Sequence, residues 1–140
     1  MRTLLSLLLI PLLTGAASQP NPFTIMETGR TTRTLAEAVA AIGDRRGTII
    51  IAPGTYRQCA VQEAGTITYR AQRPGSVVFD GVTCEGKAAL VLRGRSASVE
   101  AIIFQNMRVA DGNGAGIRLE RGNLTVSASL FRTSEEGILT

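Results

Sequence analysis

The chain has 140 residues and a formal net charge of +4, with 15 Lys and Arg against 11 Asp and Glu, and it contains no His. A length near that of one domain excludes a large multidomain enzyme, and the lack of His excludes a His-containing catalytic triad and a two-His zinc motif. Lys87 is the only lysine, so there is no lysine-rich tail, and we expect no nucleic-acid partner.

The first 17 residues have the layout of a secretory signal peptide. A cationic start precedes an apolar run at residues 4–13, and small residues follow. The run is shorter than the roughly 20 residues of a spanning helix, so we expect no membrane span. We predict cleavage after Ala17 or Ser18 and a secreted or periplasmic protein. An uncleaved N-terminal anchor is the alternative.

Cys59 and Cys84 are the only cysteines. Two cysteines are too few for a structural zinc site or for a disulfide framework. After export they can form one bridge, because an oxidising compartment permits it. The bridge would close a loop of 25 positions, and such loops stabilise a fold by roughly 3 to 4 kcal/mol.

The rest of the chain contains a leader, one predicted helix and many predicted strands. The leader covers residues 18–33 and is rich in Pro. A helix is predicted at residues 34–43, because Thr34 and Glu37 resemble a capping box and Gly43 is a stop signal. β-branched and aliphatic runs between turn residues then predict strands at residues 48–51, 67–70, 77–79, 90–92, 99–104, 117–119 and 124–126.

Apolar positions recur along these strands. Four pairs share an offset of 27: Leu90 and Ile117, Leu92 and Leu119, Val99 and Val126, Phe104 and Phe131. Other offsets are looser, with 23 from Ile67 to Leu90, 25 from Phe79 to Phe104, and 21 from Ile117 to Ile138. Variable repeat length with fixed inward positions is typical of a solenoid. We therefore predict an all-β fold over residues 34–140, a right-handed parallel β-helix with a short N-terminal capping helix. A Greek-key sandwich is the competing fold.

Several segments resemble right-handed parallel β-helix proteins of the pectate-lyase superfamily. They are GTIIIAPGTY at residues 47–56, PGSVVFDG at residues 74–81, and the stretches 99–106 and 111–118. The resemblance implies a secreted protein that binds or processes an acidic polysaccharide along an outer groove. In lyases of this kind, a basic residue removes a uronate C5 proton, and Arg or Ca²⁺ neutralises the carboxylate. The resemblance also implies a C-terminally truncated chain, with the catalytic centre outside it.

Three functions follow from the resemblance. The first is a lyase-like, carbohydrate-active protein of which this chain is the capping and substrate-flanking part. The second is a non-catalytic extracellular or cell-surface module for carbohydrate binding or adhesion. The third is a glycoside hydrolase, which needs an Asp cluster that the sequence lacks. In each case the partner is a polysaccharide, and we expect a monomer.

Strand alternation predicts two outward columns. One contains Thr68, Val91 and Arg118, and the other contains Arg70, Arg93 and Glu120. The columns are either a solvated face with one weak ion pair or an arginine ladder for sugar carboxylates, because the planar guanidinium binds carboxylates bidentately. The predicted substrate-binding residues are Arg70, Arg93, Arg118, Glu120, Asp111 and Asn113.

The surplus of the 27-residue repeat lies in a glycine-rich loop at residues 107–114. Asp111 with Asn113, Glu120 or Glu136 could supply oxygen ligands to Ca²⁺; simple turn chemistry is the other explanation. We expect no other metal or cofactor.

Two further groups were considered for acid and base chemistry. Lys87 is a conceivable lyase base, although a lone lysine in a turn is more often simply solvated. Glu135 and Glu136 form a poor acid and base pair, because adjacent strand residues face opposite sides.

Overall fold

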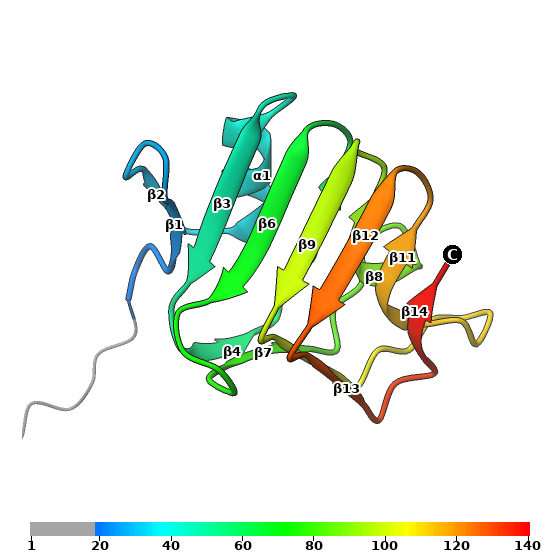
Figure 1. The fold of residues 1–140 in the computed structure, drawn as a ribbon. Coiled ribbons are helices and arrows are strands. Elements are labelled where there is room, and N and C mark those ends of the chain that lie inside the picture. Colours follow the sequence, from blue (N-terminus) through cyan, green and yellow to red (C-terminus); the bar gives the residue numbers. More distant parts are fainter. Residues whose placement is uncertain (1–18) are drawn as a thin grey trace, which may run out of the picture.

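Three sheets of mainly parallel strands surround one core (Figure 1). The computed structural model describes residues 19–140, so the predicted signal peptide lies outside the described residues. In order, the elements are β1 (Phe23–Ile25), β2 (Thr31–Thr32), α1 (Leu35–Ile42), β3 (Arg46–Ile51), β4 (Gly54–Tyr56), β5 (Ala60–Gln62), β6 (Thr66–Ala71), β7 (Val77–Asp80), β8 (Ala88–Leu92), β9 (Ser96–Glu100), β10 (Ile103–Gln105), β11 (Ala115–Leu119), β12 (Asn123–Ser127), β13 (Leu130–Arg132) and β14 (Glu136–Leu139).

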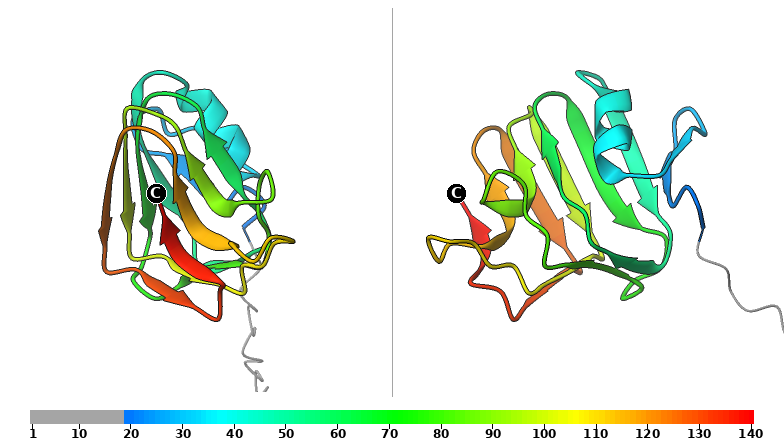
Figure 2. Two further views of the ribbon diagram at one scale, coloured as in Figure 1. Left: turned by 90° about the vertical axis from the view of Figure 1, so that its right-hand side faces the viewer. Right: turned by 180° about the vertical axis from the view of Figure 1, so that it is seen from behind.

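The strands alternate among the sheets along the chain. Sheet A has the order β12-β9-β6-β3-β1-β2, sheet B the order β13-β10-β7-β4, and sheet C the order β14-β11-β8-β5. From β3 onward the chain passes through sheets A, B and C in turn, and each new strand pairs in parallel with the previous strand of its sheet. Figure 2 shows the three sheets enclosing a narrow interior.

The interior is packed with the inward side chains of all three sheets. Alternation along β6 buries Ile67, Tyr69 and Ala71, and leaves the residues between them half-exposed. One column of rings runs along the core, with neighbouring centroids 5.1 to 5.8 Å apart. It consists of Phe23, Tyr56, Phe79, Phe104 and Phe131.

The strand registers confirm the 27-residue offset. All four predicted pairs are aligned partners in the parallel ladders of β8–β11, β9–β12 and β10–β13. The 23-residue offset is wrong, because Ile67 aligns with Ala97 in sheet A, whereas Leu90 aligns with Ala60 in sheet C. The sequence analysis missed β5, and so it placed β6 next to a strand of another sheet.

The helix predicted at residues 34–43 is confirmed. The Thr34 hydroxyl accepts a hydrogen bond from the Glu37 N–H (3.2 Å), and the Glu37 carboxylate accepts one from the Arg33 N–H (3.2 Å). The helix α1 buries Leu35, Ala38, Val39 and Ile42 against the core. Residues 19–33, predicted only as a leader, contain β1 and β2, and these strands pair antiparallel.

The predicted fold class, an all-β right-handed parallel β-helix built as one solenoid, is wrong. The fold is mixed α/β, with one short helix and three separate sheets. The chain bends sharply at residues such as Ala101 and Asn106, both with φ of 60°, so no ladder continues from one sheet into the next. The helix and the antiparallel β1 and β2 add non-repeating elements to the core.

The predicted disulfide is confirmed. Cys59 and Cys84 are bonded, with their Cα atoms 5.5 Å apart. Cys59 lies just before β5, and Cys84 lies in the loop that precedes β8, so the bond fastens that loop to the outer side of sheet C. Within residues 19–140, no helical segment has the length and apolar character of a membrane span.

The two ends of the sheets differ. At one end, β1 and β2 extend sheet A and α1 packs beside them. At the other end, β12, β13 and β14 each pair on one side only within the described residues. We call the surface formed by β12, β13 and β14 the open end.

Candidate functional site

Arg93 lies at the centre of a charged cluster on sheet C. It follows β8 directly, and its guanidinium contacts Glu63 (2.8 Å), Glu85 (2.5 Å) and Glu120 (2.7 Å). The Lys87 ammonium lies 2.5 Å from another oxygen of Glu120. We call Glu63, Glu85, Lys87, Arg93 and Glu120 the Arg93 cluster. The predicted pair of Arg93 and Glu120 is therefore present, with three partners that the sequence analysis did not assign to it.

The charges of the Arg93 cluster stabilise one another. Hydrogen bonds to Glu85 and Glu120 raise the pKa of Arg93. Hydrogen bonds from Lys87 and Arg93 lower the pKa of Glu120 to about 2, and the bond to Glu120 raises the pKa of Lys87. Lys87 thus holds its proton and is a poor general base. All three guanidinium nitrogens of Arg93 already contact carboxylates, so the arginine does not offer a free fork to a sugar acid.

Arg70 lies in a different part of the molecule from Arg93. It is on β6 of sheet A, where its Nε donates to a Glu100 oxygen at 2.5 Å. Arg70 and Glu100 are aligned partners on β6 and β9, and the bond to Glu100 raises the pKa of Arg70. The predicted column of Arg70 and Arg93 is not formed.

The outer face of sheet C is largely covered beside Arg118. Val91, predicted to be exposed, is fully buried. It packs with Ala88 and Ala115 in a small apolar cluster that Cys84 also contacts. Arg118 aligns with Val91 and is half-buried. Its Nε is buried and has no hydrogen-bond partner among the described residues.

The glycine-rich loop shows turn chemistry. An Asp111 carboxylate oxygen accepts a hydrogen bond from the Asn113 N–H at 3.2 Å. Glu135 holds the loop, since one of its oxygens accepts from the N–H groups of Val109 (3.0 Å) and Gly114 (2.6 Å). Glu120 belongs to the Arg93 cluster. Over residues 19–140, no group of three or more His, Cys, Asp and Glu residues is arranged to hold a metal ion, so the proposed Ca²⁺ ligands do not converge.

The outer face of sheet A is flat, polar and uncovered (Figure 1). Its outward side chains form three rows across β3, β6, β9 and β12, set by the strand registers. The rows are Arg46, Thr66, Ser96, Asn123; Thr48, Thr68, Ser98, Thr125; and Ile50, Arg70, Glu100, Ser127. We call this surface the polar face.

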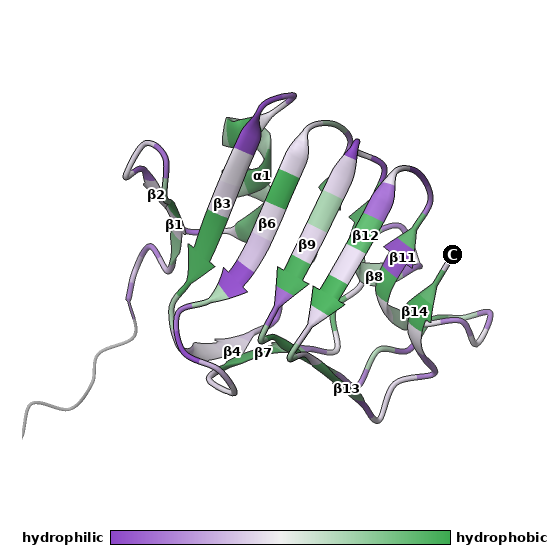
Figure 3. Cartoon of the chain, in the orientation of Figure 1, coloured by the Kyte–Doolittle hydropathy of each residue, from purple (hydrophilic) through white to green (hydrophobic). Residues whose placement is uncertain are grey.

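The hydroxyls of the polar face are free. The hydroxyls that donate hydrogen bonds within the described chain belong to other positions, such as Thr32 and Ser76. Neighbouring side chains in a row are about 4.8 Å apart and successive rows about 6.6 Å apart, from strand geometry. Figure 3 shows the polar residues of β6 and β12 alternating with apolar ones that point into the core. The surface is thus a regular array of donors and acceptors.

A groove of about 370 Å³ adjoins the polar face at β1. Its apolar part includes Met26, which is 55% exposed, and the half-buried Ile50. Its polar part includes Thr24 and the amides of Gln19 and Gln72. We call it the Met26 groove. It offers apolar contact and planar amides beside the hydroxyl array.

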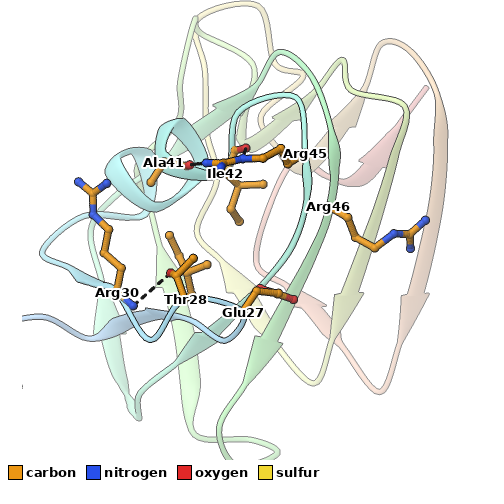
Figure 4. A pocket seen from close by; sticks show the side chains of 8 residues that line it. Glu27, Thr28, Arg30, Ala41, Ile42, Arg45 and Arg46 are labelled. Atoms are coloured by element: carbon orange, nitrogen blue, oxygen red, sulfur yellow. Dashed lines mark hydrogen bonds between the residues drawn. The ribbon is translucent and has the colours of Figure 1, made fainter.

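A second pocket, of about 250 Å³, lies between α1 and the turn after β1 (Figure 4). Its arginines do not converge on one point. The Arg45 guanidinium donates to the Ala41 carbonyl at 2.8 Å. The guanidinium groups of Arg30 and Arg46 lie on opposite sides of the view. This pocket is therefore a weaker candidate than the polar face.

No family model, no curated protein and no solved structure matches this chain. The resemblance to the pectate-lyase superfamily therefore stays a prediction.

The polar face was missed at the sequence level, although a signal for it was present. Thr66 and Thr68, like Ser96 and Ser98, are spaced by two and so share one face of a strand. Two consecutive strands with this pattern indicate a hydroxyl-bearing face. Glu63 and Glu85 lie outside the strands, so alternation gave no signal for their contact with Arg93.

Proposed function

We propose that this protein is a secreted, non-catalytic module that binds an extracellular polysaccharide on the polar face. The observation that carries the proposal is the array of free hydroxyls on the one broad sheet face that nothing covers. Binding is favoured over catalysis because Lys87, the candidate base, is paired with Glu120. Of the functions considered from the sequence, this is the binding module.

The chemistry of the face suits a carbohydrate polymer. Hydroxyl and amide groups both donate and accept hydrogen bonds, as sugar hydroxyls do. Met26 and Ile50 offer apolar surface to the C–H faces of a sugar ring. A repeating array matches a repeating ligand, since each added sugar unit meets the same donors and acceptors.

An acidic polysaccharide is the finer proposal. Arg70 is 42% exposed and uses its Nε on Glu100, so its two terminal nitrogens remain available. A guanidinium in this state can bind a carboxylate with two parallel hydrogen bonds. Export is supported by the signal-peptide pattern and by the Cys59–Cys84 bond.

The test measures binding to a panel of acidic and neutral polysaccharides by affinity electrophoresis and calorimetry. Thr68→Val with Ser98→Ala removes two hydroxyls from the centre of the polar face. We expect affinity to fall by roughly 5- to 100-fold, from about 1 kcal/mol for each lost hydrogen bond. The matched control is Thr55→Val, an exposed threonine on β4 of sheet B, which should bind as the unmodified protein does.

Two outcomes would contradict the proposal. Unchanged affinity in the double variant means that the sugar lies elsewhere, and loss on Arg93→Ala in a folded protein would point to the sheet C column predicted from the sequence. Release of unsaturated uronate products, detected by ultraviolet absorbance, would support a lyase instead.

A further inference from the structure

We propose that two copies of this chain associate through the open end, related by a two-fold axis. The inference concerns a different surface from the polar face and does not depend on carbohydrate binding. It replaces the monomer expected from the sequence.

The open end leaves core positions uncovered. Equivalent residues one layer below are fully buried: Phe104 and Val99 are both 0% exposed. Their partners Phe131 and Val126 are only partly buried, although they align in the ladders. Leu130 and Ile138, on the same surface, are 47% and 39% exposed. An apolar surface of this kind, bounded by strands, favours association.

The backbone of the open end is also unpaired. Each of its three strands has hydrogen-bonding groups along one edge with no strand beside them, and such edges pair readily with another chain. A two-fold axis lying in this surface reverses the direction in which the strands run around it. Facing strands then become antiparallel, with β12 opposite its own copy and β13 opposite β14 of the partner subunit.

Charge favours this arrangement over a rotated one. Arg132 ends β13, and Glu136 begins β14, so both flank the same corner of the open end. An axis through that corner brings Arg132 toward Glu136 of the partner subunit, and the reverse contact forms by symmetry. Within residues 19–140 both side chains are exposed, and Arg132 makes its bond to Gln105 through Nε alone.

The opposite end explains why the assembly stops at two copies. There sheet A continues into the antiparallel β1 and β2, and α1 packs against β1 and β5. A head-to-tail contact would need unpaired strands at both ends. A two-fold contact uses the open end of each copy and leaves none free.

The test is sedimentation equilibrium over a wide range of concentration. We expect a monomer and dimer equilibrium, weakened at least about tenfold by Leu130→Lys or Ile138→Lys, because a buried charge disfavours the contact. Met26→Lys is the matched control: it also replaces an exposed large apolar side chain, but lies away from the open end. Its dimerisation should be unchanged.

Charge reversal tests the two-fold geometry. Arg132→Glu and Glu136→Arg should each weaken the dimer, and the two together should restore it. A protein that stays monomeric at every concentration would overturn the proposal. So would assemblies that grow beyond a dimer, or a dimer insensitive to both charge reversals. Polysaccharide binding by a monomeric Leu130→Lys variant would show that the two proposals stand separately.

Discussion

An arginine is needed at position 93 because three carboxylates approach it from different directions. Its Nε and its two terminal nitrogens contact Glu120, Glu63 and Glu85. A lysine would present one point charge to the same groups. The sequence predicted the contact with Glu120, which follows from strand register. The contacts with Glu63 and Glu85 depend on how turns fold over sheet C, and no local pattern encodes them.

The Arg93 cluster should make stability depend on pH. The pKa of Glu120 is lowered from 4.5 to about 2 in the folded protein, so the stability that its charge contributes is present above about pH 4.5 and is lost as the pH falls through about 2. We expect Glu120→Gln to melt at a lower temperature than the unmodified protein near neutral pH. The two melting curves should converge near pH 2.

Thermal melts between neutral pH and pH 2 check this expectation. Asp111→Asn is the control, since Asp111 makes no ion pair among the described residues and asparagine can still accept the bond from Asn113. A Glu120→Gln difference that stays constant down to pH 2 would contradict the assigned role of the carboxylate.

Short elements were the hardest to predict from the sequence. Alternation identified β6 and β9, which have six and five residues. Strands β4, β5 and β13 have only three residues each, too few for a period of two to stand out. In β4, the residues Pro53 and Gly54 also read as a turn. Missing β5 had the largest effect, because it displaced Arg70 into the wrong column.

At the level of elements, close approach of neighbouring turns requires glycine at position 94. Gly94 is buried in the turn between β8 and β9, and a Cβ there would lie 2.6 Å from the Ala64 carbonyl oxygen and 2.8 Å from that of Gly65. Both contacts are with backbone, so a side-chain rotation cannot relieve them. We expect Gly94→Ala to lower the free energy of unfolding by about 2 kcal/mol or more.

Chemical denaturation measures this loss. Gly112→Ala is the comparison, because nothing lies within 4 Å of its added Cβ and only the positive φ of 78° disfavours alanine there, at roughly 1 kcal/mol. If both substitutions cost the same, steric contact between the turns is not what requires glycine.

For the whole molecule, the sequence indicated strand alignment better than fold class. The 27-residue offset gave correct partners, since inward positions must stack on one another in a ladder. It carried no information on how sharply the chain bends between sheets, nor on the contribution of α1, β1 and β2 to the core. The exposed face was also mistaken: coverage of sheet C depends on a distant loop held by the Cys59–Cys84 bond.

Removing that bond should loosen sheet C selectively. We expect Cys59→Ser with Cys84→Ser to lower the free energy of unfolding by roughly 3 kcal/mol, from the loop-closure entropy of the unfolded chain. Release of the loop should also expose Val91 to solvent. Urea unfolding measures the first effect, and hydrogen exchange of β8 measures the second.

Affinity for polysaccharide provides the contrast in this experiment. The polar face lies on sheet A and should retain its binding in the cysteine variant. Unchanged exchange of β8 would contradict the role given to the loop as a cover.

The column of rings implies an order in which the molecule opens. Phe79 and Phe104 are sealed by a layer on either side, whereas Phe131 has a layer on one side only. Local opening requires least free energy where fewest apolar contacts are lost. Amide protection should therefore rise step by step from β12 through β9 to β6, so that the monomer frays from one end like a thread.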